Sequence, residues 1–275
     1  VLAAQMGYLP GTLWIRVGVV FAGAVQDMLV LFFSTRRDGR SLGDLIKSEL
    51  GEVPGVIALF GAFMIMVIIL AEAGLFSGAA LLMGRIGASE LAGHTVALQV
   101  AALAFQIPFG VGQAATIRVG YHFGAGDHAA IGRAGWIGIG VAAGFMCLTA
   151  ALMIFAPMLL LQIYVDPFAP ENAAMVGFAV AYMLVAAGFQ LFDGVQAVAA
   201  GALRGLQDTR VPMLIAIFSY WVPGYGVAIW LGFYTPLEGT GVWIGLAIGL
   251  VFAAGLLTYR WARRETFGLL PSPSA

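Results

Sequence analysis

Lysine is almost absent from this sequence, and charged residues of either sign are few. Lys47 is the only lysine among 275 residues, and Asp, Glu, Lys and Arg together make up 10% of the chain. A soluble domain carries about 25% charged residues. The net charge of −1 provides no basic field of the kind that nucleic acid requires. We therefore expect no nucleic-acid partner.

Residues that catalyse or bind metals are also scarce. Cys147 is the only cysteine, which excludes an intrachain disulfide and a cysteine-based metal site, and we expect it to be a small buried hydrophobe. The three histidines, at 94, 122 and 128, show no spacing typical of metal ligands. The sequence has no nucleotide-binding glycine loop and no plausible nucleophile–base pair. These absences predict a protein that is not an enzyme and needs no organic cofactor.

Apolar residues dominate instead: 61% of the chain is hydrophobic and its mean hydropathy is +0.96. An apolar run of about 20 residues crosses a bilayer as a helix. The runs lack the alternation of a membrane β-barrel, so helix is the expected state. We predict an all-α integral membrane protein of about seven transmembrane helices, at 12–33, 54–83, 93–120, 131–162, 173–203, 211–233 and 240–259.

The basic residues predict the orientation of these spans. With the N-terminus outside and the C-terminus inside, eleven of the 13 Lys and Arg residues fall on the inner side. Only Arg16 and Arg85 then lie outside. Cytoplasmic connections carry an excess of Lys and Arg, so this orientation is favoured. Between the fifth and sixth spans, Gly205 predicts a helix end, and Asp208-Thr209 with Pro212 predicts a helix start.

Three acids fall inside predicted spans, at Asp27, Glu72 and Asp193. A charge at mid-bilayer costs about 2.5–3.5 kcal/mol on insertion scales, so each acid must bind a cation, be protonated or pair with a base. No Lys or Arg lies near the middle of any span. Asp27 lies nearer a span end, whereas Glu72 and Asp193 both fall near mid-membrane. The structural alternative is a neutral, hydrogen-bonded acid that holds helices together.

Glutamines accompany these acids. Gln190 and Gln196 lie three residues on either side of Asp193, on neighbouring parts of one helix face. In the third span, a seven-residue spacing places three more on one face, as either cavity-lining or interhelical hydrogen-bonding groups: Gln99, Gln106 and Gln113.

Residues with special backbone roles also fall within the spans. Pro108 and Pro223 predict bends in the third and sixth spans. Two glycine sets have the spacing that permits close contact between membrane helices: Gly140/Gly144 and Gly241/Gly245/Gly249.

Several stretches resemble bacterial members of the multidrug and toxic compound extrusion (MATE) family, over roughly 70–264. They are Leu81-Leu-Met-Gly-Arg-Ile-Gly-Ala-Ser-Glu-Leu-Ala-Gly-His94 with Ala97-Leu-Gln99, Pro108-Phe-Gly-Val-Gly-Gln-Ala-Ala-Thr-Ile-Arg-Val-Gly120 with Gly124-Ala-Gly-Asp127, Phe192-Asp-Gly-Val-Gln-Ala-Val-Ala-Ala-Gly-Ala-Leu-Arg-Gly205, and Asp208-Thr-Arg-Val-Pro212. Residues 1–65 resemble the family only weakly.

The resemblance implies a division of the chain, because the family has twelve spans in two six-helix lobes. Residues 1–50 would hold the last span of the first lobe and the cytoplasmic loop between lobes. Residues 51–265 would form the second lobe, and 266–275 a cytoplasmic tail. The implied location is the bacterial cytoplasmic (inner) membrane, with lipid as a partner. Most of the first lobe is absent from this sequence.

The resemblance further implies a function. The family exports organic cations in exchange for Na⁺ or H⁺, and its second-lobe ion site corresponds here to Glu72 and Asp193. Phe189, Phe192 and Tyr225 are candidates to contact a substrate cation through their ring faces.

Three alternatives to this function are considered in turn by what each would require of the sequence. The first is a non-transporting fragment or a half-transporter that needs a separate first lobe. The second is a lipid-linked saccharide flippase of the same superfamily, which the scarcity of basic residues within the spans disfavours. The third is a seven-span receptor or retinal protein, which shares the topology. A retinal protein needs a lysine in its last span for the Schiff base, and the only lysine, Lys47, lies in a loop.

Overall fold

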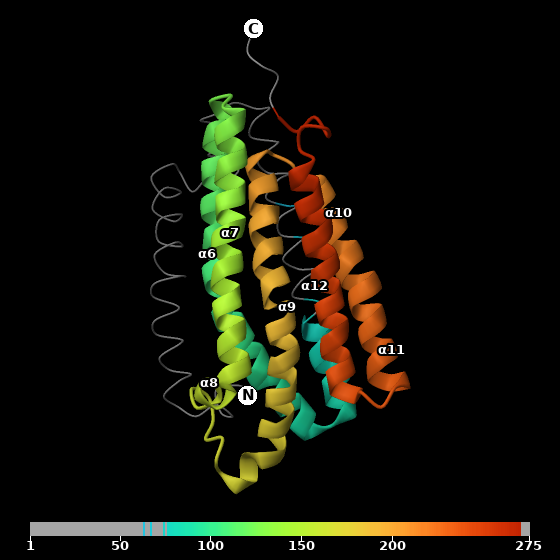
Figure 1. Ribbon diagram of the computed structural model, residues 1–275. Coiled ribbons are helices and arrows are strands. Elements are labelled where there is room, and N and C mark those ends of the chain that lie inside the picture. The colour runs from blue at the N-terminus through green and yellow to red at the C-terminus, as the bar shows by residue number, and fades with distance from the viewer. Residues whose placement is uncertain (1–62, 64–66, 68–73, 75, 271–275) are drawn as a thin grey trace, which may run out of the picture. The chain divides into compact units, whose positions relative to one another are not determined.

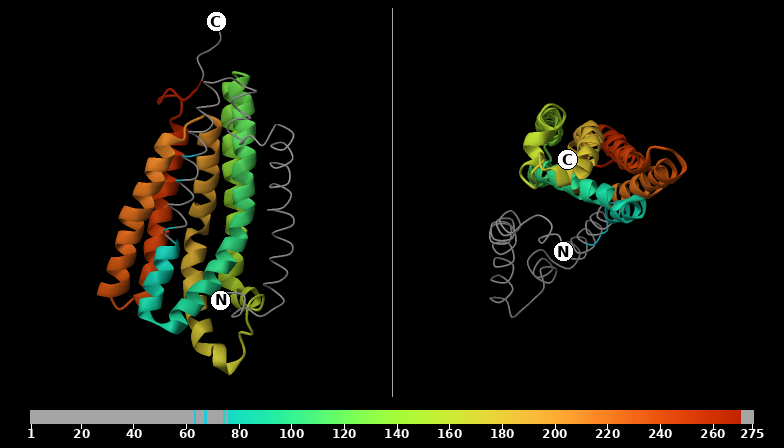
Figure 2. Two further views of the ribbon diagram at one scale, coloured as in Figure 1. Left: turned by 180° about the vertical axis from the view of Figure 1, so that it is seen from behind. Right: turned by 90° about the horizontal axis from the view of Figure 1, so that it is seen from below.

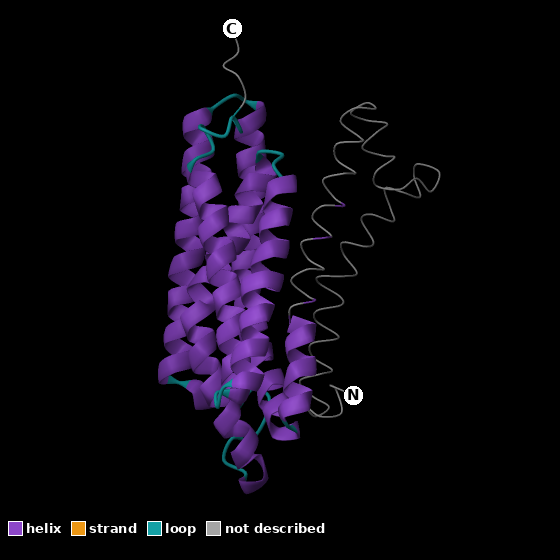
Figure 3. Ribbon diagram, turned by 90° about the vertical axis from the view of Figure 1, so that its right-hand side faces the viewer, coloured by secondary structure: helices purple, strands orange, loops and turns teal. Residues whose placement is uncertain are grey.

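The computed structural model describes residues 63, 67, 74 and 76–270. This part of the chain consists of helices joined by loops and contains no strand (Figure 3). A short apolar helix, Phe76–Ile86, precedes the labelled elements. These are α6 (Ala88–Gly124), α7 (His128–Phe155), α8 (Pro157–Leu161), η2 (Pro170–Asn172), α9 (Ala173–Gly205), α10 (Arg210–Ser219), η3 (Tyr220–Tyr225), α11 (Gly226–Tyr234) and α12 (Glu238–Ala262).

Five helical stretches are long and apolar enough to cross a membrane: α6, α7, η2–α9, α10–η3–α11 and α12. They confirm the third to seventh predicted spans. The first predicted span and most of the second lie outside the described residues. The fourth was predicted too long, because α7 ends at Phe155 and Pro157 begins α8. A proline disfavours helical backbone at the residue before it, and Ala156 accordingly leaves the helix with φ −136°.

The helices pack as a bundle in which α9 is central (Figures 1 and 2). It contacts α6 and α7 on one side and α12 on the other. The continuous stretch α10–η3–α11 in turn packs along α12. All these elements belong to the compact unit formed by Ile65–Gln162 and Asp166–Ala275. The segment that carries Asp193 therefore packs against three other helices of this unit.

Small residues allow these helices to approach closely. A Cβ on Gly201 of α9 would collide with the carbonyl oxygen of Gly112 on α6. On α12, the predicted small-residue set is confirmed: Cβ atoms at Gly241, Gly245 and Gly249 would meet the α10–η3–α11 stretch. Gly140 and Gly144 of α7, the other set, make no such contact among the described residues, because no atom lies within 4 Å of an added Cβ on either.

Large apolar side chains cover the outside of the bundle. Leu81 is 72% exposed, Ile117 70% and Phe155 86%. Such a surface is stable only against lipid or another apolar partner. Cys147 lies on the exposed face of α7, so the expectation that it is buried was wrong. Apolar sequence does not separate lipid-facing from core positions in a membrane helix.

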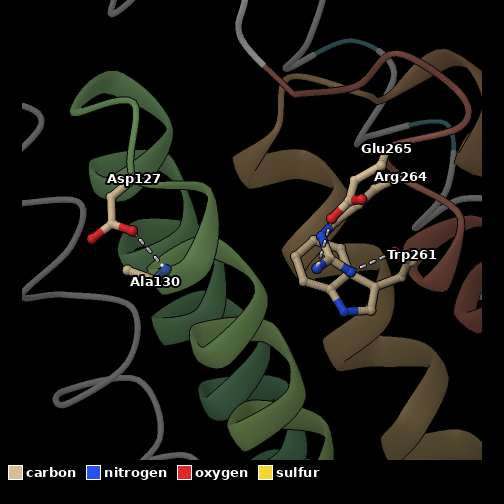
Figure 4. A network of polar contacts seen from close by, with 5 residues as sticks. All are labelled: Asp127, Ala130, Trp261, Arg264 and Glu265. Atoms are coloured by element: carbon tan, nitrogen blue, oxygen red, sulfur yellow. Dashed lines mark hydrogen bonds and ion pairs between the residues drawn. The ribbon is translucent and has the colours of Figure 1, made fainter. Parts of the chain in front are cut away.

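Polar contacts order the helix ends where α7 begins and α12 finishes (Figure 4). The Asp127 carboxylate accepts a hydrogen bond from the Ala130 backbone N–H at 2.9 Å, which caps α7. The Arg264 guanidinium lies 4.9 Å from the Trp261 ring centroid, donates to the Trp261 carbonyl at 3.1 Å, and approaches Glu265 at 4.0 Å. These contacts hold the end of α12 against its own last turn.

The connection between α9 and α10 differs in detail from its sequence signals. Helix α9 ends at Gly205, as predicted, and the turn places Gln207 at φ +63°. Thr209 is the N-cap of α10 but makes no side-chain cap hydrogen bond. Asp208 instead forms an ion pair with Arg260 of α12, 2.5 Å from oxygen to nitrogen. The pair ties the loop to the last helix.

Candidate functional site

Asp193 lies two-thirds of the way along α9, and its residue is only 6% exposed. The following residue, Gly194, lets other helices approach. A Cβ there would lie 2.6 Å from Met146 Cγ of α7 and 3.5 Å from Pro108 Cβ of α6. Helix α6 continues through Pro108, and this proline packs beside the segment that carries Asp193. The bend expected at Pro108 stays a prediction.

A chain of hydrogen bonds leads to the Asp193 carboxylate. The Tyr220 hydroxyl donates to Gln196 Oε1 at 2.8 Å, and Gln196 Nε2 donates to Asp193 Oδ1 at 3.4 Å. All three side chains are buried. Because Tyr220 engages the amide oxygen, the amide N–H groups turn toward the acid. The network therefore presents a hydrogen-bond donor to the carboxylate.

Tyr220 reaches this network from a widened stretch of helix. It begins η3, a π-helical turn that contains Pro223 within the otherwise continuous α10–α11 helix. Proline lacks the N–H that an α-helix requires at that position, and π-bulges commonly accommodate such defects at functional sites. Gly249 of α12 packs on Gly224 Cα and the Ser219 carbonyl, at 3.0 and 3.1 Å from an added Cβ. The predicted irregularity at Pro223 is thus present as a π segment.

The other side of η3 faces the short helix that precedes α6. Trp221 and Tyr225 have ring centroids 5.5 Å apart. An added Cβ on Gly74 would lie 3.0 Å from the Trp221 ring, and one on Gly78 2.7 Å from the Tyr225 ring. Glu72, the second predicted ion ligand, lies outside the described residues, as does Asp27. In the sequence Glu72 is two positions before Gly74.

The remaining predicted site residues occupy two environments. Gln190 is fully buried, and Phe189 stacks on Trp243 of α12 with centroids 5.9 Å apart. Phe192 and Tyr225 are half-buried.

The glutamines of α6 lie on a different face from the buried site. Gln106 and Gln113 are exposed, whereas Gln99 is half-buried. Their cavity-lining role stays a prediction.

Sequence reasoning missed Tyr220 as a member of the network. It stands 24 residues from Gln196 and in a different helix. Its position three residues before a mid-span proline was the only available signal.

The sequence of this chain is similar to those of known proteins. Two curated relatives are each named probable multidrug resistance protein NorM. The one from Mesorhizobium japonicum is 40% identical over 247 residues, which cover 90% of this chain and 52% of the relative. The one from Brucella suis is 46% identical over 192 residues, which cover 70% of this chain and 41% of the relative. The chain thus spans about half the length of these relatives.

Solved structures share the fold. The eukaryotic MATE transporter AtDTX14 superposes with a TM-score of 0.66 at 22% identity, over 76% of this chain and 48% of its own. This chain belongs to the MATE family. A Pyrococcus furiosus transporter of the MOP superfamily also matches, with a TM-score of 0.65 at 20% identity, over 98% of this chain and 62% of its own.

One comparison disagrees with this assignment. The family model of the carbon starvation protein CstA matches residues 1–231. That match stops inside α11 and omits α12, whose Trp243 and Leu246 are fully buried in the bundle. The MATE assignment rests on 40% identity over 247 aligned residues and on the fold, which agree with each other. We therefore give the MATE assignment precedence.

Proposed function

We propose that this chain is the second lobe of an ion-coupled exporter of organic cations in a bacterial cytoplasmic membrane. Asp193 takes up H⁺ or Na⁺ in each cycle. The observation that carries the proposal is the buried Tyr220–Gln196–Asp193 network. An acid at this depth in an apolar helix is costly unless it binds a cation or a proton.

The network suits reversible ion loading. The Gln196 amide offers a neutral donor to the Asp193 carboxylate at 3.4 Å. A proton or a Na⁺ ion binds the same carboxylate when the site is loaded. Because Tyr220 belongs to the π segment, a change at Asp193 is transmitted through Gln196 to η3. Loading therefore biases the helix stretch whose backbone is least regular.

Residues outside α9 are proposed to contribute to the ion site and to the substrate path. Glu72 is the proposed second ion ligand, since it precedes the segment that packs on Trp221 and Tyr225. The exposed glutamines of α6 are proposed to face the substrate path, because a polar side chain on the outside of a membrane bundle requires water or a polar partner. A first lobe is proposed to supply the rest of that path, since the chain spans about half the length of its relatives.

The test uses the natural full-length protein in inside-out vesicles. Uptake of a fluorescent lipophilic cation is followed under an imposed H⁺ or Na⁺ gradient. Asp193→Asn and Glu72→Gln should each abolish gradient-driven uptake. Glu171→Gln, which changes an exposed acid in η2, is the matched control and should transport normally. Uptake that survives Asp193→Asn would refute the assigned role of Asp193.

A parallel sample tests whether the chain acts alone. Residues 1–275 are reconstituted without any further segment and assayed in the same way. Uptake by this sample would show that a single lobe suffices. No uptake, beside an active full-length protein, would support the half-transporter model.

A further inference from the structure

Three buried polar side chains form a cluster distinct from the Asp193 network: His94 of α6, Tyr182 of α9 and Trp243 of α12. Gln190, farther along α9, is also buried, and each of the four residues is at most 1% exposed. Both ring nitrogens of His94, the Tyr182 hydroxyl, both amide atoms of Gln190 and the Trp243 indole N–H have no hydrogen-bond partner in the described part of the chain.

The rings of this cluster surround Trp243. The His94 ring meets it edge-on, with centroids 5.5 Å apart and planes at 68°. The Tyr182 and Phe189 rings stack on it, with centroids at 5.7 and 5.9 Å. Gln190 follows Phe189 directly on α9. Unpaired polar atoms from three helices are thus gathered around one indole ring.

So many unpaired polar atoms in one place require explanation. Buried polar groups in folded proteins nearly always have a hydrogen-bond partner, and ordered water supplies it where protein does not. A buried water needs two to four polar partners, roughly what neighbouring His, Tyr and Trp groups offer together. An apolar cavity stays dry, but this cluster is polar.

The cluster lies between the end of the bundle and Asp193. The Tyr182 hydroxyl lies against Gly239 in the first turn of α12, next to Glu238. Glu90 lies in the first turn of α6, one helical turn before His94. At the other end, Gln190 precedes Asp193 by three residues on α9. This is the lower end of the bundle in Figure 1, where α6 and α12 begin.

We propose that internal water bridges these side chains and connects the Glu90 and Glu238 end of the lobe to Asp193. The chain of water carries a proton. An O–H bond forms on the Asp193 carboxylate as a water O–H bond breaks, and that water is reprotonated from solution at the Glu90 and Glu238 end. This inference rests on the proposed ion coupling at Asp193 and adds the route by which the proton arrives.

X-ray hydroxyl-radical footprinting of the natural full-length protein tests the water directly. Radicals formed from a bound water oxidise the side chains beside it, even when these are inaccessible from outside. We expect oxidation of Tyr182 and Trp243, and none of Met153, which is 1% exposed in the apolar part of α7. Methionine reacts readily, so it is a demanding dry control. Oxidation of the two rings no faster than that of Met153 would overturn the proposal.

Transport measurements test the proton route. Tyr182→Phe removes only the hydroxyl, and His94→Phe keeps the size and aromatic contacts of the side chain. Each should slow H⁺-driven uptake while leaving the KM for the cation substrate unchanged. Tyr259→Phe, an exposed position near the end of α12, should have no effect. Equal turnover in all three variants would contradict the route.

The two proposals fail differently. If Asp193→Asn retains gradient-driven uptake, the proposed function is wrong and the proton route has no destination. If Asp193→Asn abolishes uptake but the footprint shows no buried oxidation, only the water route is wrong. Uptake driven by Na⁺ alone and unaffected by Tyr182→Phe also refutes the route, while leaving Asp193 as an ion ligand.

Discussion

The contact between α6 and α9 makes a quantitative prediction through Gly201. A Cβ added to this residue would approach the Gly112 carbonyl oxygen more closely than real Cβ atoms do. Both partners are backbone, so no flexible side chain can move aside. The Thr116 hydroxyl also donates to the Gly201 carbonyl at 2.8 Å, across the same contact. Gly201→Ala must therefore separate the two helices or distort them.

The size of the effect follows from opposing contributions. Overpacking of a close contact costs about 1–3 kcal/mol. Loss of an interhelical hydrogen bond in a membrane adds about 0.6 kcal/mol. Replacing a helical glycine by alanine returns about 0.5–1 kcal/mol, because the unfolded chain has less conformational freedom to lose. We expect Gly201→Ala to lower the free energy of unfolding by about 1–3 kcal/mol.

Gly140→Ala is the matched control, because the same change meets nothing within 4 Å at that position. Only the helix-propensity contribution remains, so a gain of about 0.5–1 kcal/mol is expected. Both variants of the full-length protein are unfolded reversibly in mixed micelles, and helicity is followed by circular dichroism. Equal stability of the two variants would show that α6 and α9 are not in close contact at Gly201.

Three further predictions concern polar groups and the cysteine. Asp208→Asn removes one charge of the ion pair with Arg260. The Asp208 side chain is 8% exposed and the Arg260 side chain 16%. The substitution should cost somewhat less than the roughly 3–5 kcal/mol of a fully buried pair, as measured by the same unfolding assay; a neutral result would mean that water solvates the pair. Tyr220→Phe leaves Gln196 Oε1 without its 2.8 Å donor and should cost about 1–3 kcal/mol, with a weaker ion dependence of uptake; unchanged stability would contradict the network. Cys147→Ala on the exposed face of α7 should change unfolding by less than about 0.5 kcal/mol, and a larger loss would show that a partner covers this face.

The predicted ion site was only partly open to test. The depth and spacing of Asp193, Gln190 and Gln196 in one apolar run predicted that they share a face, and all three are buried on α9. Their exact partners did not follow from spacing. Gln196 pairs with Tyr220 of another helix, whereas Gln190 has no partner in the described residues. The part that Glu72 plays stays a prediction.

The pattern of apolar residues in the sequence did not indicate which side of a membrane helix faces the inside of the bundle. Cys147 was expected to be buried, yet it is exposed on α7. Gly140, whose spacing permits close helix contact, has no atom within 4 Å of an added Cβ. In a soluble helix the polar face marks the outside, but in lipid both faces are apolar.

The sequence alone determined the membrane class, the last five spans and the family resemblance, because these depend on local composition and order along the chain. Only the tertiary structure decided that Tyr220 supports Asp193 through Gln196, and that His94, Tyr182 and Trp243 meet. Those contacts join residues far apart in the sequence, and they depend on how each helix is rotated against α9.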